Sequence, residues 1–210
     1  IPASLNNYPL INTGATTPTP VCANINIASG ARLDLQIGGK ITIYGAITTA
    51  NGGVFNAVDG TIELAGSSPQ TIPTSAFQNN NLRNLIINNS IVTLGDSLNL
   101  FGKLSFSGNN RTFNATNGKL TLKSNATLTA SVADITKDAN TQAIISGNQI
   151  TGDVTVERYI SARKSWRLIS MPTKHNLQTI QQSLQENGVQ ASNPVPGYGT
   201  ILGSSRSSWL

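Results

Sequence analysis

Short apolar–polar–apolar triplets recur between residues 21 and 135, and they constrain the fold of this 210-residue chain more than any other feature. The clearest examples lie at 25–27, 33–35, 41–43, 62–64, 98–100, 104–106 and 120–122. Alternation with a period of two is typical of a β-strand with one buried face. The triplets often start about eight residues apart, and Gly, Asn and Ser separate them. Many short, evenly spaced strands predict a repetitive β architecture.

The turn residues favour a parallel β-helix, in which the chain winds as a solenoid. Gly30, Gly38 and Gly45 follow successive triplets, and glycine tolerates the backbone angles of sharp corners. A coil of three short strands takes about 20 residues, so we expect roughly five coils. One short strand cannot bury its apolar face alone, whereas a buried side chain in a stack contributes about 1.5–3 kcal/mol. We therefore predict that Ile43, Leu64, Leu100 and Leu122 share one dry interior.

The sequence divides into three parts. Residues 1–20 are polar and rich in proline, which predicts a cap strand near Leu10–Ile11 and a connector. The predicted solenoid spans residues 21–150, and its triplet pattern is interrupted over residues 67–90. Residues 151–210 are predicted to begin a β-sandwich-like domain, with strands at 154–160 and 165–170 and one short helix at 176–187. Because the chain begins with isoleucine rather than methionine, we expect it to be an internal piece of a longer protein.

The composition is unusual for a cytosolic enzyme, because charged residues make up only 11% of the chain. Neutral polar residues fill the surface positions, as in extracellular β-rich proteins. The net charge is +5, but the basic residues are scattered singly from Arg32 to Lys123. The one tight group is Arg158, Arg163, Lys164 and Arg167, so we expect no nucleic-acid surface. No apolar run approaches the roughly 20 residues that span a bilayer, so we expect no membrane insertion. Cys22 is the single cysteine, which excludes an internal disulfide.

Few residues suggest catalysis. Asp34 and Glu63 occupy the middle of their triplets, where we expect them to face solvent, and two acids at equivalent coil positions would suit hydrolysis. The acids are spread along the chain, however, which favours a solvated strand surface. His175 is the single histidine and is predicted to lie in an exposed loop, while Cys22 is predicted to pack as a small apolar residue. We therefore predict no catalytic residue, no metal site, no cofactor and no enzymatic activity.

Three aromatic residues are candidates for contact with a glycan. Trp166 and Tyr159 lie on the two strands predicted for the second domain, and Tyr44 lies at a corner of the solenoid. Aromatic rings can stack on sugars, but packing in the core of the second domain is the favoured role for the first two.

Three segments resemble parts of a known family. Val154–Ile160 followed by Trp166–Pro172 resembles a junction in large surface proteins of Bacteroidota. The blocks 22–31 and 60–72 resemble the repetitive region that precedes this junction. The resemblance implies an extracellular, cell-surface location. It also implies export by the type IX secretion machinery, with a C-terminal sorting domain on the full protein. In such a host, Asp96–Ser97–Leu98 resembles an acceptor site for O-glycosylation at Ser97.

The leading interpretation is a structural or adhesive segment of a large secreted surface protein. The coil would act as a stiff spacer, with surface glycans or other cell-surface proteins as partners. A glycan-binding module is the first alternative, and a polysaccharide lyase or hydrolase on a β-helix is the second.

Overall fold

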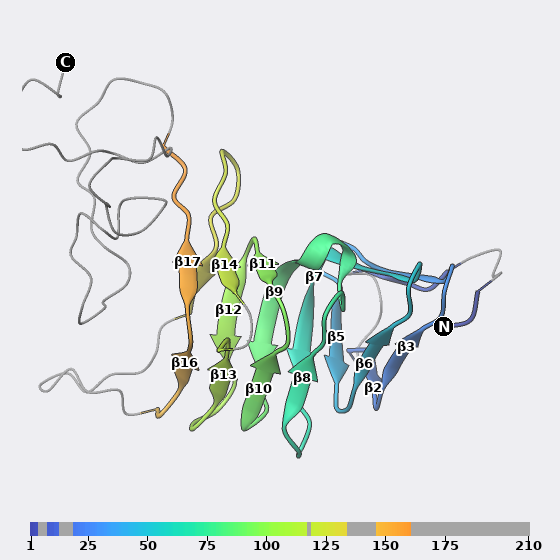
Figure 1. The fold of residues 1–210 in the computed structure, drawn as a ribbon, viewed down its shortest axis with the longest axis horizontal. Coiled ribbons are helices and arrows are strands. Elements are labelled where there is room, and N and C mark those ends of the chain that lie inside the picture. The colour runs from blue at the N-terminus through green and yellow to red at the C-terminus, as the bar shows by residue number, and fades with distance from the viewer. Residues whose placement is uncertain (4–7, 13–18, 117–118, 134–145, 161–210) are drawn as a thin grey trace, which may run out of the picture. The chain divides into compact units, whose positions relative to one another are not determined.

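The structure is a computed structural model that describes residues 1–3, 8–12, 19–116, 119–133 and 146–160. Residues 1–161 form one compact unit, and every described residue belongs to it. The unit is a parallel β-solenoid of about five turns, which confirms the predicted parallel β-helix (Figure 1). The strand at 165–170 and the helix at 176–187 lie outside the described residues.

Three faces surround the interior of the solenoid. Face 1 contains β1 (Leu10–Ile11), β4 (Arg32–Leu35), the first parts of β7 (Val54–Leu64) and β9 (Asn81–Ile87), β11 (Leu98–Leu100), β14 (Leu120–Leu122) and β17 (Val154–Val156). Face 2 contains β2 (Val21–Cys22), β5 (Lys40–Ile43), the second parts of β7 and β9, β12 (Lys103–Phe106) and β15 (Ser131–Val132). Face 3 contains β3 (Ile25–Ile27), β6 (Ile47–Thr49), β8 (Gln70–Ile72), β10 (Ile91–Leu94), β13 (Thr112–Asn114) and β16 (Gln149–Thr151).

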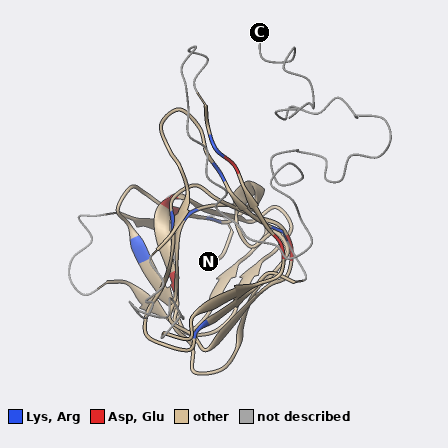
Figure 2. Cartoon of the chain, turned by 90° about the vertical axis from the view of Figure 1, so that its left-hand side faces the viewer, with Lys and Arg blue, Asp and Glu red and all other residues tan. Residues whose placement is uncertain are grey.

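Every pairing between these strands is parallel, and matching residues of successive turns lie side by side. On face 2, Ile43 pairs with Leu64, Leu64 with Ile87, and Ile87 with Phe106. These pairs lie 21, 23 and 19 residues apart, close to the predicted length of a coil. Figure 2, which looks along the stack, shows the three sides around a common interior.

The interior is a continuous stack of apolar side chains. Ile43, Leu64, Leu100 and Leu122 belong to one buried cluster, with exposed fractions of 0%, 1%, 0% and 4%. The prediction of a shared dry interior is therefore confirmed. Phe55 and Phe113 are the largest fully buried side chains in it.

Glycine permits a close approach of two turns where β7 passes from one face to the next. β7 runs without interruption from face 1 to face 2, and Gly60 lies where its pairing register shifts. A Cβ atom at Gly60 would lie 2.4 Å from the Cβ atom of Leu35, on the preceding turn. No larger residue fits there unless the two turns move apart.

Buried amide side chains hold the backbone of other corners. Asn89 is fully buried, and its Nδ2 atom donates to the carbonyl oxygens of Gly66 and Ser68 at 2.8 and 2.6 Å. Its Oδ1 atom accepts a hydrogen bond from the backbone of Ile91 at 2.9 Å. Gln70 donates to the carbonyl oxygens of the turn before it, so each amide ties one turn to its predecessor.

The solenoid extends past the boundary predicted at residue 150. β16 pairs with β13, and β17 pairs with β14, so Val154–Val156 continues face 1. This segment alternates because it has an inward and an outward side within the solenoid, and the sequence pattern alone does not say which sheet a strand joins. At the other end, Leu10–Ile11 forms the predicted short strand and pairs with β4.

Face 3 is interrupted between the second and third turns. β6 pairs with β3, and β8 pairs with β10, but no ladder joins β6 to β8. After β8 the chain forms η1 (Gln78–Asn80), the one helical element among the described residues. Of the elements at this interruption, β8 and η1 lie within residues 67–90, where the triplet pattern breaks.

Candidate functional site

Asp34, one of the two acids considered for catalysis, lies on the outer side of face 1. Its carboxylate accepts two hydrogen bonds from Arg32, at 2.5 and 2.6 Å, and one from Asn56 at 2.8 Å. Partial burial by itself raises the pKa of Asp34. The hydrogen bonds from Arg32 and Asn56 and the charge of Arg32 outweigh that effect and hold the pKa below its ordinary value.

Glu63 lies on face 2 and joins three successive turns. Its Oε2 atom lies 2.6 Å from Nζ of Lys40 and accepts a hydrogen bond from Thr42 at 3.1 Å, both on the preceding turn. Its Oε1 atom accepts a hydrogen bond from Asn88 on the following turn at 2.8 Å. Burial tends to raise the pKa of Glu63, but the bonds from Lys40, Asn88 and Thr42 and the charge of Lys40 hold it below its ordinary value.

The prediction that both acids face solvent is wrong for Glu63, which is only 8% exposed. The middle position of its triplet does point away from the core, but Lys40, Thr42 and Asn88 bond to the carboxylate there. Asp34 and Glu63 also pair with different partners, Asn56 and Thr42, on different faces. The fold therefore does not bring them together as a catalytic pair.

The three aromatic candidates do not form one described surface. Tyr44 is half-exposed at the corner after β5, on the second turn. Tyr159 is half-exposed after β17, and its backbone donates to Oγ of Ser124 at 2.9 Å. Several turns separate these two tyrosines along the stack, and Trp166 lies outside the described residues.

The remaining candidate residues are Ser97, Cys22 and His175. Ser97, predicted as an O-glycosylation site, is exposed in the turn before β11, where its backbone N–H donates to Oδ1 of Asp96 at 2.7 Å. Cys22 is half-buried against the core, and burial raises the pKa of its thiol. His175 lies outside the described residues.

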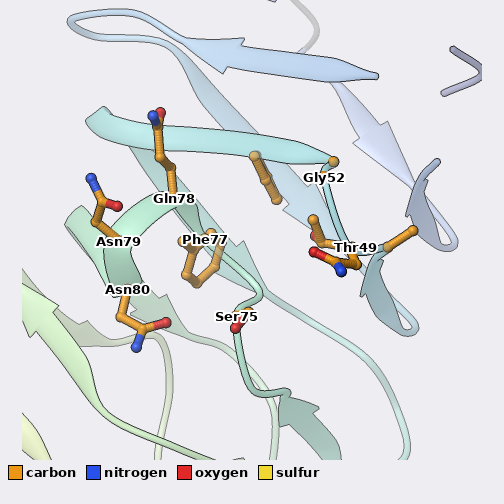
Figure 3. Close-up of a pocket in the computed structure, with 11 residues that line it drawn as sticks. Thr49, Gly52, Ser75, Phe77, Gln78, Asn79 and Asn80 are labelled. Atoms are coloured by element: carbon orange, nitrogen blue, oxygen red, sulfur yellow. The ribbon is translucent and has the colours of Figure 1, made fainter. Parts of the chain in front are cut away.

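A depression that the sequence analysis did not single out opens at the interruption of face 3. Its volume is about 570 Å³ (Figure 3). The turn from β6 into β7, residues 49–53, forms one wall, and the segment from Ser75 to Asn80 forms the other. Phe77 and Phe55 line it from beneath, with ring centroids 5.2 Å apart. The Pro69–Pro73 segment and the run of Gln78 to Asn81 are the sequence signals that mark this place.

The described residues lack two features, a metal-binding cluster and a membrane-spanning helix. They contain no cluster of three or more His, Cys, Asp or Glu side chains in an arrangement that would hold a metal ion. No helix among them is long and apolar enough to cross a membrane.

Comparison with known proteins does not identify a family or a function. The sequence matches no model of a protein family, no curated protein and no solved structure.

Proposed function

We propose that the solenoid is a stiff structural spacer in a large secreted cell-surface protein, with its outer faces available for adhesion. The observation that carries this proposal is that bonds of several kinds tie each turn to its neighbours. Parallel ladders join the strands of successive turns within each face, apolar side chains stack through the interior, and polar groups bond between turns. Bending such a stack would break many of these contacts at once, as in other solenoid proteins whose repeats contact their neighbours.

Charged side chains support the same proposal, because they form bonds that stabilise the solenoid. Asp34 and Glu63 bond across turns, and Arg83 lies 3.8 Å from Asp59 on the preceding turn. Lys123 forms a further ion pair with Glu157. The low charge content and the resemblance around Val154–Pro172 support the secreted, cell-surface location, with the type IX secretion machinery as the export partner.

Stiffness can be measured directly with spin labels near the two ends of face 3. Asn26 and Gln149 are exposed on β3 and β16. Four ladders and the interruption between β6 and β8 separate these two strands. At about 4.8 Å per turn, five turns place them roughly 24 Å apart. In a Cys22→Ala background, Asn26→Cys and Gln149→Cys would carry the labels. A spacer gives one narrow distance distribution by pulsed electron resonance, whereas a broad or divided distribution would reveal a hinge and contradict the proposal.

The location needs a separate test. Antibodies raised against the solenoid should label intact cells of the producing organism, and external protease should remove that signal. Confinement of the protein to the cytoplasm would contradict the surface role.

A further inference from the structure

The depression at the interruption of face 3 differs from the rest of the solenoid in its backbone. Four non-glycine residues in the described chain have φ angles in the left-handed region, and three of them line this depression. They are Ser75 at 57°, Asn79 at 55° and Asn80 at 56°. Such residues are uncommon and persist where the surrounding structure holds them, often around a ligand site.

The asparagine side chains in the wall of the depression also differ from other asparagines of the solenoid in their hydrogen bonds. Asn24, Asn84 and Asn89 each bond to the backbone of a neighbouring turn. Asn79 and Asn80 line the depression (Figure 3), and their side-chain amides, by contrast, form no hydrogen bond with any other described residue. Groups of this kind are free to bond to a ligand.

The chemistry of the lining selects among ligand classes. Amide and hydroxyl side chains surround it, and every residue of the lining is uncharged. Phe77 and Phe55 lie on the core side of these polar groups and are buried, at 3% and 0% exposed. Neutral sugars present many uncharged hydroxyl groups, which match the amide and hydroxyl side chains of the lining. A phosphate or carboxylate ligand would lack a cationic partner here, and the volume of about 570 Å³ is within the range of small-molecule sites.

We propose that this depression binds a neutral saccharide of a few sugar units. Asn79 and Asn80 bond to its hydroxyl groups, and the turn at residues 49–53 closes the opposite side. The proposal goes beyond the spacer function and does not depend on it, because a stiff scaffold presents the site whether or not it stands on a cell.

Saturation-transfer nuclear magnetic resonance and titration calorimetry on the full chain test the proposal. The probes are maltotriose, cellotriose, mannotriose and tri-N-acetylchitotriose. A charged comparator, trigalacturonate, and a blocked tetra-alanine peptide complete the panel. At least one neutral trisaccharide should bind saturably, and its binding should shift the backbone amide signals of residues 49–53 and 75–80.

Glycine substitutions remove the amides without disturbing the backbone. Glycine accepts positive φ angles readily, so the double variant Asn79→Gly, Asn80→Gly should fold. It should bind the trisaccharide at least roughly tenfold more weakly, which corresponds to about 1.4 kcal/mol. Asn110→Gly is the matched control, because Asn110 also has a left-handed φ of 57° but lies outside the depression. This control should retain the affinity of the unmodified protein.

Three results would overturn the proposal. One is that no neutral trisaccharide binds at millimolar concentration. Another is that binding is restricted to trigalacturonate or the peptide. The third is that the Asn79, Asn80 double variant and the Asn110 control bind equally well.

Discussion

At the scale of single residues, the outward side chains of the solenoid act as links between turns. The triplet pattern shows that Glu63 points away from the core, but it does not show which side chains lie beside it on the neighbouring turns. Those partners, Lys40, Thr42 and Asn88, are between 21 and 25 positions away from Glu63 in the sequence. Only the register of the stack brings them to the carboxylate.

Replacing this carboxylate should weaken the stack. Glu63→Gln is expected to lower the free energy of unfolding at neutral pH by about 1–3 kcal/mol, because it leaves the Lys40 ammonium without its counter-charge. Urea denaturation measures the change. Asp153→Asn is the control, since Asp153 is exposed and forms no ion pair with the described residues. That control should stay within about 0.5 kcal/mol of the unmodified protein.

The effect of Glu63→Gln on the free energy of unfolding should depend on pH. Because folding lowers the pKa of Glu63, the unfolded chain takes up the proton first as the pH falls. The stabilisation is complete well above the ordinary glutamate value of about 4.3, and it disappears as the pH falls through the lower folded value. The stability difference between the unmodified protein and Glu63→Gln should therefore shrink below about pH 4. A difference that grows on acidification would contradict this account of the pKa.

The buried amide of Asn89 should be more sensitive still. Asn89→Ala leaves the carbonyl oxygens of Gly66 and Ser68 and the N–H of Ile91 without their partner. We expect a loss of about 2–4 kcal/mol in the free energy of unfolding, measured with urea. Asn26→Ala, at an exposed position of β3, should change it little. Equal effects of the two substitutions would show that the corner amide does not hold the turn.

At the scale of elements, the sequence predicts strands better than it predicts their partners. Triplets such as Ile25–Ile27 and Leu98–Leu100 form strands whose first and third residues are buried, as the alternation indicates. The continuous passage of β7 from face 1 to face 2 is not visible in the pattern. It depends on the close approach of Gly60 to Leu35, which are far apart in sequence.

The candidate site was the harder feature to predict. Residues 67–90 interrupt the triplet pattern, which indicates an irregular region but not a depression. The wall opposite, residues 49–53, belongs to the preceding turn and looks like an ordinary glycine corner in the sequence. The aromatic residues that the sequence does single out, Tyr44 and Tyr159, lie on separate turns because aromatic character alone does not predict spatial proximity.

Each strand should depend on its inward side chains. On β13, Phe113 is fully buried, and Phe113→Ala is expected to lower the free energy of unfolding by about 3–5 kcal/mol through lost burial and a cavity. On β14, Thr121→Ala changes an outward, partly exposed position and should cost less than about 1 kcal/mol. Thermal denaturation followed by circular dichroism compares the two. A similar effect of both would contradict the assignment of inward and outward positions.

At the scale of the whole solenoid, the register makes one turn a unit that can be removed. Ile87 and Phe106 occupy equivalent positions, so deletion of residues 88–106 removes β10, β11 and β12 together. The strands on either side, β8 with β13 and β9 with β14 and β15, then face each other in an equivalent register. Deletion of residues 88–97 instead removes about half a turn and moves every later strand onto the wrong face.

Deletion of the complete turn is therefore the most direct test of the stacked solenoid. The account predicts that the protein lacking residues 88–106 still unfolds cooperatively, keeps its β circular dichroism spectrum and shortens by one strand spacing of about 4.8 Å in small-angle scattering. The protein lacking residues 88–97 should lose cooperative unfolding. If the full-turn deletion unfolds while the half-turn deletion stays folded, or if both behave alike, successive turns do not stack as equivalent layers and the account is contradicted.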